Sequence, residues 1–395
     1  MFQRPHLQQL KERMLESRRF IQVIVGPRQV GKTTLVGQLV KELSIPSHMV
    51  SADGIAASNI VWLNQQWETA RQLLKSNKHI SYLLVIDEIQ KIDNWSETVK
   101  TLWDEDTKNN CNLKVLILGS SRLILQKGLT ESLAGRFEKT YMGHWSFQEM
   151  KDAFGFTQEQ YVWFGGYPGS ASLIHDEQRW KHYIKESLIE TSILKDVLML
   201  ARIDKPVLLK NLFEIGCFYS GQILSYTKIM GQLQGVGNTT TLSNYLNLLD
   251  TAGLLSGIEK FSPSIIRKRS SSPKFQVHNT ALISGQSTTL FNDIKNNSAA
   301  WGRIVESAIG AHLLNYSLTM DYVLNYWREG DAEVDFVITK NNISVAIEVK
   351  SSKATITNGM KQFQKRYAPQ KIILIGADGI KWQDFLMMNP SDLFS

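Results

Sequence analysis

The sequence feature that most constrains the fold is a glycine-rich segment that follows a short apolar run near the N-terminus. The apolar run, Phe20 to Val25, is brief and rich in β-branched residues, which predicts a buried strand. Residues 26–33 (GPRQVGKT) fit the pattern G-x-x-x-x-G-K-[ST], and leucine and valine at helical spacing follow them. A strand, this loop and a helix, in that order, predict a phosphate-binding P-loop in an α/β domain.

The residue types in this loop suit the binding of a nucleoside triphosphate. Gly26 and Gly31 let the backbone curl so that its N–H groups converge on phosphate oxygens. We expect Lys32 to contact the outer phosphates and the Thr33 hydroxyl to ligate Mg²⁺, so ATP and Mg²⁺ are the predicted cofactors. The alternative is a glycine-rich turn before an ordinary helix. The predicted nucleotide-binding residues of the loop are Gly26, Pro27, Arg28, Gln29, Val30, Gly31, Lys32, Thr33 and Thr34.

A second apolar run, Tyr82 to Ile86, ends in the carboxylates Asp87 and Glu88. A buried strand with this acidic end is typical of a Walker B element. We expect Asp87 to hold Mg²⁺, directly or through water, and Glu88 to orient and polarise the attacking water. The alternative is a buried strand with an acidic end and no chemical role.

Two further polar elements follow the next predicted strand, 114–118. Either Ser120 or Ser121 is expected to act as a sensor of the γ-phosphate or the attacking water, and the alternative is a simple turn. Arg136 comes after a predicted helix, where a ring ATPase projects an arginine finger into its neighbour's site. Its alternative is a surface arginine in a local salt bridge.

Five segments taken in order resemble one family. They are Gly26 to Thr34, Ile86 to Gln90, Leu118 to Ser121, Leu133 to Arg136 and Phe164 to Pro168. Together they resemble the bacterial and archaeal AAA-type ATPases that carry a C-terminal restriction-endonuclease-like domain. The resemblance implies an ATPase core over residues 1–146, a helical lid over 147–203, and self-association into a ring, for which a hexamer is one size. The sequence departs from the family at 277–279 (VHN), where an acidic residue and a glycine are expected nearby.

Residues 204–272 are predicted to form a winged helix-turn-helix. Three apolar-periodic helices are expected at 207–218, 226–233 and 240–252, with Asn238 or Thr239 as the cap of the third. The run 254–261 and the basic segment 266–269 (IRKR) resemble a wing. DNA contact is the favoured role, and an interaction module or spacer is the alternative. The small polar side chains expected to face a groove are Thr239, Thr241, Ser243, Asn244 and Asn247.

Residues 273–395 are predicted to form an α/β restriction-endonuclease-like domain with a second chemical site. Two alternating segments, 332–338 and 345–350, predict a hairpin that brings Asp335 beside Glu348 and Lys350. This is the D…E-x-K arrangement of the PD-(D/E)XK nucleases, in which carboxylates hold Mg²⁺ and the lysine serves the attacking water. Glu306, on a predicted helix, is expected to turn inward as a further metal ligand. Gln362 is a weaker candidate contact.

The alternatives for this site are a polar protein surface and a nuclease fold that grips DNA or a partner without cleaving. The net charge of +7 agrees with a polyanionic partner, and two cysteines give no disulfide framework. Neither a signal peptide nor a membrane span is expected, which predicts a cytoplasmic protein. The favoured function is an ATP-driven DNA nuclease in DNA processing or genome defence. The alternatives are a STAND-type ATP switch and a DNA-binding scaffold with an inactive nuclease fold.

Overall fold

The computed structural model divides into two units, an N-terminal unit (Met1–Met142) and a C-terminal unit (Gly143–Ser395). The structure describes residues 2–76, 80–119, 132–192, 197, 203–233, 238–262, 271–350, 356–376 and 378–395. Ser120, Ser121 and the basic segment 266–269 lie outside these ranges. Among the described residues, no helix has the length and apolar character that a membrane crossing requires.

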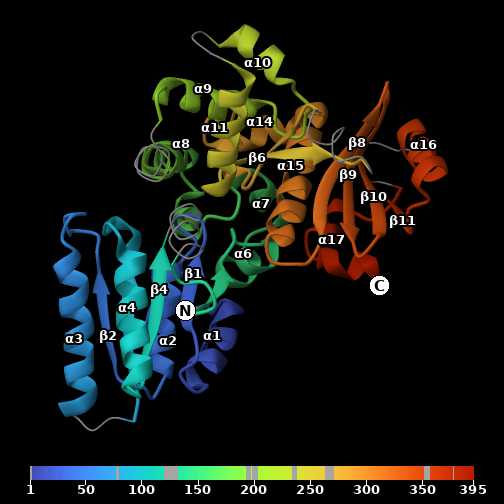
Figure 1. Cartoon of the computed structure of the whole chain (residues 1–395). Helices are drawn as coiled ribbons and strands as arrows, with labels where there is room; N and C mark the ends of the chain where they lie inside the picture. Colours follow the sequence, from blue (N-terminus) through green and yellow to red (C-terminus); the bar gives the residue numbers. More distant parts are fainter. Residues whose placement is uncertain are drawn as a thin grey trace. The chain divides into compact units, whose positions relative to one another are not determined.

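The N-terminal unit is a parallel sheet flanked by helices (Figure 1). Its strand order is β2-β3-β4-β1-β5, and every pairing is parallel. All five residues of β1 are buried, as the apolar run predicts. The strands are β1 (Ile21–Val25), β2 (Ser47–Ser51), β3 (Tyr82–Asp87), β4 (Leu113–Gly119) and β5 (Phe137–Tyr141). The helices are α1 (His6–Leu15), α2 (Lys32–Glu42), α3 (Ile60–Ser76), η1 (Ile89–Lys91) and α4 (Trp95–Lys108).

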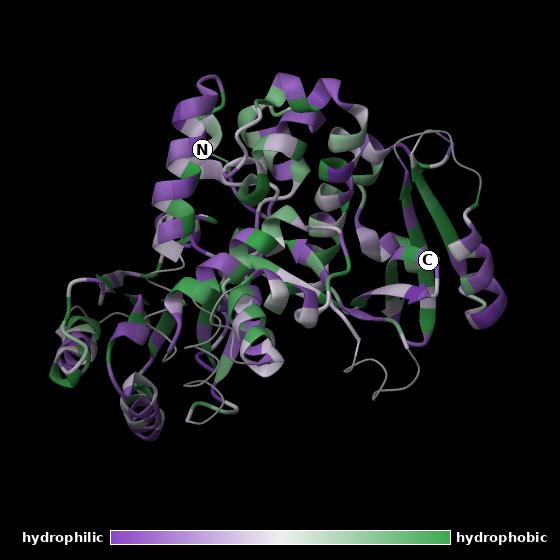
Figure 2. Ribbon diagram, turned by 90° about the horizontal axis from the view of Figure 1, so that it is seen from above, coloured by the Kyte–Doolittle hydropathy of each residue, from purple (hydrophilic) through white to green (hydrophobic). Residues whose placement is uncertain are grey.

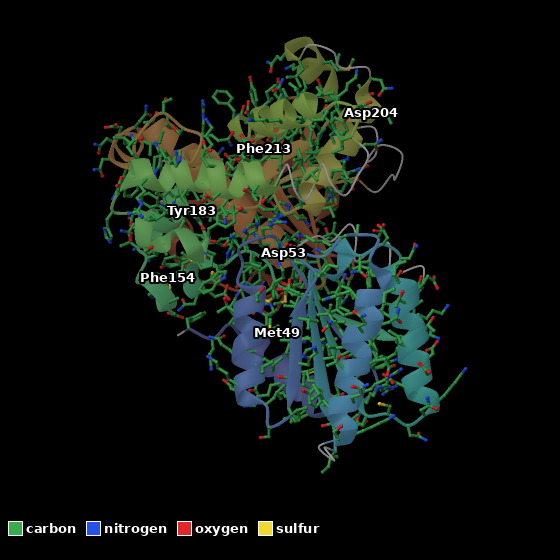
Figure 3. The ribbon with its side chains drawn as sticks, turned by 90° about the vertical axis from the view of Figure 1, so that its left-hand side faces the viewer. Met49, Asp53, Phe154, Tyr183, Asp204 and Phe213 are labelled. Carbon is green, nitrogen blue, oxygen red and sulfur yellow. The ribbon has the colours of Figure 1, made fainter. Side chains whose placement is uncertain are left out.

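Because the strands are parallel, the loops that follow β1, β2 and β3 meet at one edge of this sheet. The loop after β1 is the glycine-rich segment, and β3 ends at Asp87. Figure 3 labels Met49 within β2 and Asp53 in the loop that follows it. Lys91 forms an ion pair with Asp53 and so joins this loop to the segment after β3. The predicted nucleotide site therefore lies at the carboxyl edge of the sheet.

The C-terminal unit begins with helices. They are α6 (Phe147–Phe154), α7 (Gln158–Phe164), η2 (Pro168–Leu173), α8 (Glu177–His182), the π-helix η3 (Tyr183–Glu190), α9 (Pro206–Phe218), α10 (Tyr226–Gln232) and α11 (Thr239–Thr251). Asn238 caps α11, because its side chain accepts a hydrogen bond from the Thr241 amide at 2.8 Å. Figure 3 labels Tyr183 in η3 and Phe213 in α9. The predicted helices at 207–218, 226–233 and 240–252 are present within one residue at each end.

The rest of this unit forms a six-stranded sheet with the order β11-β10-β9-β8-β6-β7. Its strands are β6 (Leu255–Lys260), β7 (Lys274–Val277), β8 (Val323–Glu329), β9 (Ala332–Lys340), β10 (Ile343–Lys350) and β11 (Lys371–Gly376). Its helices are α13 (Ala281–Ser284), α14 (Phe291–Asn296), α15 (Ser298–Ser317), α16 (Asn358–Tyr367), α17 (Trp382–Phe385) and the 3₁₀ helix η5 (Pro390–Phe394). In Figure 2 the strands near the C-terminus are largely hydrophobic, whereas the helices carry both hydrophobic and hydrophilic residues.

The predicted domain boundaries at 203/204 and 272/273 fall inside the C-terminal unit. β6 and β7 pair antiparallel across the second boundary, and β6 also pairs in parallel with β8 at two positions. The predicted wing segment 254–261 therefore belongs to the same sheet as the predicted nuclease strands. The described strands on the two sides of residue 272 share one sheet, and the division into these domains stays a prediction.

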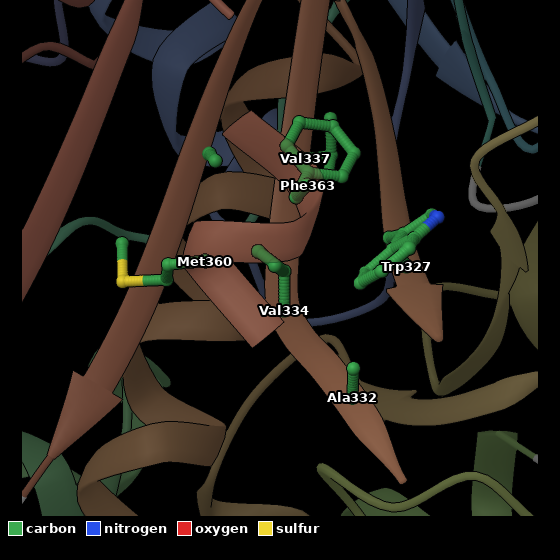
Figure 4. Packing of buried hydrophobic residues seen from close by; sticks show 7 residues of the cluster. Trp327, Ala332, Val334, Val337, Met360 and Phe363 are labelled. Atoms are coloured by element: carbon green, nitrogen blue, oxygen red, sulfur yellow. The ribbon is translucent and has the colours of Figure 1, made fainter. Parts of the chain in front are cut away.

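The predicted hairpin of β9 and β10 is confirmed as an antiparallel pair, with Ile347 opposite Phe336. Asn341 and Asn342 both have positive φ, which asparagine tolerates in tight turns. One face of this hairpin is covered by α16, through a buried cluster drawn in Figure 4. The cluster consists of Trp327, Ala332, Val334, Val337, Ala346, Met360 and Phe363. The same two strands carry Asp335 and Glu348 of the predicted site.

The segment 165–168 (GGYP) is packed against the turn after β7. A Cβ at Gly165 would lie 1.9 Å from Asn279 Oδ1, so a side chain has no room there. Asn279 Oδ1 accepts hydrogen bonds from the amides of Gly166 and Ala281, and its Nδ2 is paired with His144. Asn279 stands near the position where the family resemblance leads one to expect an acidic residue. Here the neutral, buried amide of Asn279 joins Gly166, Ala281 and His144 through hydrogen bonds.

Candidate functional sites

The P-loop residues lie between β1 and α2 and have the conformation that the motif requires. Gly31 caps α2 with a φ of +89°, and Gln29 also has a positive φ of 61°. Gly26 needs its small size, because a Cβ there would lie 2.0 Å from the carbonyl oxygen of Met142. Backbone curled in this way directs N–H groups toward one point, which is a ready anion site.

Lys32 is the first residue of α2, and only 8% of it is exposed. Its Nζ donates to the carbonyl oxygens of Gly26 at 2.9 Å and Pro27 at 2.7 Å. These acceptors are neutral, so the positive charge of Lys32 is not cancelled by them. A buried ammonium group favours an anionic ligand in contact with it.

The two predicted Mg²⁺ residues of the nucleotide site are in direct contact. Thr33 Oγ1 donates to Asp87 Oδ2 at 2.9 Å, although the two residues come from α2 and β3. The other oxygen, Asp87 Oδ1, accepts from the Glu88 amide at 2.9 Å. A hydroxyl and a carboxylate side by side are the oxygen ligands that Mg²⁺ takes next to phosphates. Thr33 and Asp87 therefore fit the predicted ion.

Glu88 is held in an unusual backbone conformation directly after the strand. Its φ is 53°, which is the left-handed region that a glutamate seldom adopts. Its amide donates to the Leu118 carbonyl of β4 at 3.1 Å, and Gln90 Nε2 donates to its carboxylate at 2.6 Å. The side chain that we predict to orient water is thus fixed by neighbours on both sides.

Arg136 lies just before β5, at the amino edge of the sheet. Its carbonyl accepts from the Ile21 amide at the start of β1, whereas the P-loop follows the other end of that strand. The guanidinium makes two hydrogen bonds to Asp104 of α4, at 2.7 and 2.9 Å. This local ion pair is the alternative considered above. A finger role requires a neighbouring protomer, because Arg136 and its own P-loop lie at opposite edges.

The second predicted site is formed at one face of the six-stranded sheet. Asp335 of β9 and Glu348 of β10 come next to the Phe336–Ile347 pair, so they lie opposite each other. Asp335 Oδ2 accepts from the Val349 amide at 2.8 Å, and Lys350 Nζ lies 2.9 Å from Glu348 Oε1. Glu306 reaches the same cluster from α15, where 25% of its side chain is exposed. The four predicted residues are therefore brought together.

The structure adds a residue that the sequence analysis missed. Lys274, the first residue of β7, is fully buried. Its Nζ lies 3.1 Å from Glu306 Oε1, 3.5 Å from Asp335 Oδ1 and 3.9 Å from Glu333 Oε1. The available signal was a lysine next to apolar Phe275 in a predicted domain core, since a buried ammonium requires anionic partners.

The electrostatics of the cluster follow from burial and from this internal cation. Burial disfavours the Lys274 ammonium, but Asp335, Glu306 and Glu333 outweigh it and hold its pKa above the usual value. Burial raises the pKa of Glu306 to about 7, although Lys274 acts in the opposite direction. Burial and the nearby Asp335 raise the pKa of Glu348 to about 7, against the effect of Lys350. Four carboxylates and two lysines leave a formal charge of −2 when all are ionised.

The donor set decides how well a metal ion fits here. Among the described residues, no group of three or more His, Cys, Asp or Glu side chains is arranged to hold a metal. Mg²⁺ is commonly bound through one or two carboxylates, with water and phosphate as its other ligands. Glu348 is 4% exposed, and in the described part of the chain its Oε2 accepts no hydrogen bond. Asp335 and Glu348 therefore fit Mg²⁺, and the metal-ligand role of Glu306, which is paired with Lys274, stays a prediction.

Two other predicted contact sets are present on helices. On α11, Leu242, Tyr245, Leu246 and Leu249 are buried, as expected. Thr239, Asn244 and Asn247 are exposed, and Thr241 and Ser243 are half-buried. Gln362 is exposed on α16. No described contact links these residues to a ligand, so their roles stay predictions.

Comparison with known families gives a match for the N-terminal part of the chain. The family model of an AAA domain matches residues 18–151. The match supports an AAA-type P-loop ATPase family. It agrees with the parallel sheet, and it indicates ATP binding and ATPase activity for this part of the chain.

The C-terminal part matches two families whose descriptions give no function. Residues 156–290 match a domain of unknown function, DUF8612, and residues 301–390 match another, DUF4143. The chain is also 26% identical over 393 residues to an uncharacterized protein of Methanocaldococcus jannaschii. The similarity covers 92% of this chain and 82% of that protein.

Proposed function

We propose that this protein is an AAA-type ATPase whose ATP cycle controls a Mg²⁺-dependent DNA nuclease in its C-terminal unit. The observation that carries the ATPase part is the Thr33–Asp87 hydrogen bond, which joins the P-loop to the acidic end of β3. This bond supports a common role for the two predicted Mg²⁺ ligands with their sequence neighbours Lys32 and Glu88, which we propose to bind phosphate and to orient water. A cytoplasmic ring, with Arg136 acting on the neighbouring protomer, is part of the proposal.

The division of labour in the ATPase site follows from the charges. Lys32 donates to two neutral carbonyl oxygens of its own loop, and its positive charge binds the phosphates. Bound Mg²⁺ would neutralise phosphate charge next to Thr33 and Asp87. Glu88, fixed by Gln90, accepts a hydrogen bond from the attacking water and aligns it.

The nuclease part is supported by the convergence of Asp335, Glu348 and Lys350 on one face of the sheet. Asp335 and Glu348 would hold Mg²⁺, which when bound polarises the phosphate and the attacking water. Lys350, 2.9 Å from Glu348, is placed to stabilise the charge that develops on the phosphate. Glu306 and Lys274 form an ion pair that fixes Asp335 from the other side.

The second candidate function is a DNA-binding scaffold, or a STAND-like ATP switch, in which this fold does not cleave. Lys274 favours that candidate, because one fully buried ammonium already neutralises part of the carboxylate cluster. The two candidates differ in one measurable property, which is cleavage of DNA.

The test is a paired assay on the full-length protein. Linear, circular and single-stranded DNA are incubated with and without Mg²⁺, and with ATP, ADP or a non-hydrolysable analogue. We expect ATP hydrolysis that Lys32→Ala abolishes and DNA cleavage that Asp335→Ala, Glu348→Ala and Lys350→Ala abolish. Cleavage that survives in both Asp335→Ala and Glu348→Ala would refute the nuclease assignment, and wild-type protein that cleaves no DNA would favour the scaffold.

A further inference from the structure

A pocket of about 310 Å³ lies directly beside the candidate nuclease residues. It is lined by the first two turns of α15, the ends of β10 and β11, and α17, which lie side by side in Figure 1. Lys350 of β10 lines this pocket and also pairs with Glu348 at 2.9 Å. The same lysine therefore belongs to the pocket and to the carboxylate cluster.

The pocket is shaped by a close approach of two strands. A Cβ at Gly376 would lie 2.1 Å from the carbonyl oxygen of Lys350, and Gly376 has a φ of +149°. The Gly376 amide donates to the Ile380 carbonyl at 2.9 Å, which leads the chain back toward α17. This turn sets Lys381 and Trp382 beside the pocket.

The lining has the chemistry of a site for a planar ring that carries a negative charge nearby. Two indole rings, Trp301 and Trp382, lie with their centroids 6.4 Å apart at an interplanar angle of 73°. Lys350 and Lys381 supply positive charge, and none of the described lining residues is acidic. Any nucleobase can stack on a tryptophan ring, so this contact does not depend on the DNA sequence. Lysines contact the phosphates that connect the nucleotides.

An uninterrupted DNA duplex cannot present a single base ring to this pocket. Its bases are stacked and paired, and the removal of one base from the stack costs free energy. An unpaired base at a strand end or in a single-stranded stretch is available without that cost. A base held between α15 and α17 would place its own phosphate beside Lys350 and hence beside Glu348.

We infer that this pocket binds one unpaired base of the DNA strand, so that the C-terminal unit selects single-stranded DNA or unpaired strand ends. This inference rests on the proposed nuclease for its functional meaning, but binding of the base can be measured without cleavage. The residues that carry it are Trp301, Trp382 and Lys381.

The experiment measures the binding of short fluorescent oligonucleotides to full-length protein by anisotropy, in the presence of a chelator so that no cleavage occurs. We expect wild type to prefer single-stranded DNA over a blunt duplex of the same sequence. Trp382→Ala should weaken single-strand binding by about 5- to 150-fold, the range for loss of one stacked base. Trp382→Phe should restore most of it. Trp62→Ala, in the N-terminal unit, is the matched control and should bind as wild type.

A second arm uses oligonucleotides in which one position at a time lacks its base. For wild-type protein, loss of the base at one position should reduce the affinity for the oligonucleotide as much as Trp382→Ala does. The Trp382→Ala variant should bind that abasic oligonucleotide and the intact one equally well. Wild type that binds no DNA, or Trp301→Ala and Trp382→Ala variants that bind single strands as wild type does, would overturn the inference.

The outcomes also separate this inference from the nuclease proposal. Tryptophan-dependent binding of single strands without any Mg²⁺-dependent cleavage refutes the nuclease and leaves the pocket as a DNA-binding site. Cleavage that depends on Glu348, together with tryptophan variants that bind and cut all DNA forms as wild type does, refutes the pocket and leaves the nuclease.

Discussion

Each of the two candidate sites of this protein contains a buried lysine, but the two lysines have different partners. Lys32 is 8% exposed and donates to carbonyl oxygens of its own loop. Lys274 is fully buried and lies within 4 Å of three carboxylates. The named partners of Lys32 are neutral carbonyl groups, whereas those of Lys274 are carboxylates. We therefore expect Lys32 to contribute to ligand binding and Lys274 to contribute to stability.

The largest expected effect is at Lys32. Lys32→Ala removes the cation that contacts phosphate, so nucleotide affinity and ATPase rate should each fall by about 100-fold or more. Binding of a fluorescent ATP analogue and phosphate release measure the two quantities. Lys41→Ala, an exposed lysine at the end of the same helix, is the control and should behave as wild type. Unchanged ATP affinity in Lys32→Ala would contradict the expected difference between Lys32 and Lys274.

Glu88→Gln should separate binding from chemistry in the same site. The amide keeps the size of the side chain but loses the carboxylate that aligns water, so turnover should fall about 100-fold or more while ATP binding persists. Gln90→Ala removes the hydrogen bond to Glu88 and should have a smaller effect on turnover only. An ATPase rate in Glu88→Gln equal to that of wild type would remove the catalytic assignment.

Lys274→Met should affect stability more than ligand binding, in contrast to Lys32→Ala. It leaves Glu306 and Asp335 without their buried cation, which should cost about 3–5 kcal/mol in the free energy of unfolding. Urea denaturation of the C-terminal unit measures this change. Lys350→Met is the comparison variant, because its partner Glu348 is buried but 39% of the Lys350 side chain is exposed, and a smaller loss is expected.

The double variant Lys274→Met with Glu306→Gln sharpens this test. If the two groups stabilise each other, the double variant should be more stable than Lys274→Met alone. A Lys274→Met protein with wild-type stability would mean that the cluster does not depend on this cation.

The pH dependence of stability should also differ between the two units. The pKa values of Glu306 and Glu348 are about 7 in the folded protein, above their usual range near 4.5. The folded state therefore binds more protons than the unfolded state between these values, so stability is lost as pH rises from about 4.5 to 7. With a chelator present, we expect the C-terminal unit to lose about 1–3 kcal/mol across this window.

Glu348→Gln should flatten that slope, since the variant side chain cannot ionise. Denaturation curves collected across the pH range provide the measurement. A C-terminal unit that becomes more stable as pH rises through this window, in wild type and in Glu348→Gln alike, would contradict the raised pKa values.

The smallest effect on stability is expected at Arg136. Its ion pair with Asp104 is partly exposed, so Arg136→Ala should change the free energy of unfolding by less than about 1 kcal/mol. Its effect on ATP hydrolysis tests the finger prediction separately. A mixture of Arg136→Ala and Lys32→Ala protomers should recover ATPase activity if the arginine acts across an interface. Co-assembled mixtures without recovery would leave Arg136 as a local ion pair, and Asp104→Ala measures what that pair contributes.

Much of the local structure could be predicted from the sequence because it depends on neighbouring residues. The apolar run before Gly26 and the alternation in 332–338 and 345–350 predict β1, β9 and β10, which the structure has. Asp335 and Glu348 could be paired in advance, because a tight turn at Asn341 and Asn342 fixes the register of the hairpin.

The role of Lys274 could not be predicted in this way. Its partners lie on α15 and β9, and each is more than thirty residues away in the sequence. Only the folded structure brings them next to Lys274. The same holds for the pairing of β6 with β8, which joins the predicted wing to the predicted nuclease strands. Arg136 likewise has the motif of a finger, and only the fold shows that Asp104 is its neighbour.

The sequence by itself therefore determined the motif chemistry: a P-loop, an acidic strand end, and a hairpin with two carboxylates and a lysine. These depend on periodicity and on the residue types within a few positions of each other. Only the tertiary structure decided which charges meet, because long-range packing brings Lys274 to Glu306, and Trp301 and Trp382 to the side of Lys350. The energy of a buried charge is set by the groups around it, and those groups are chosen by the fold.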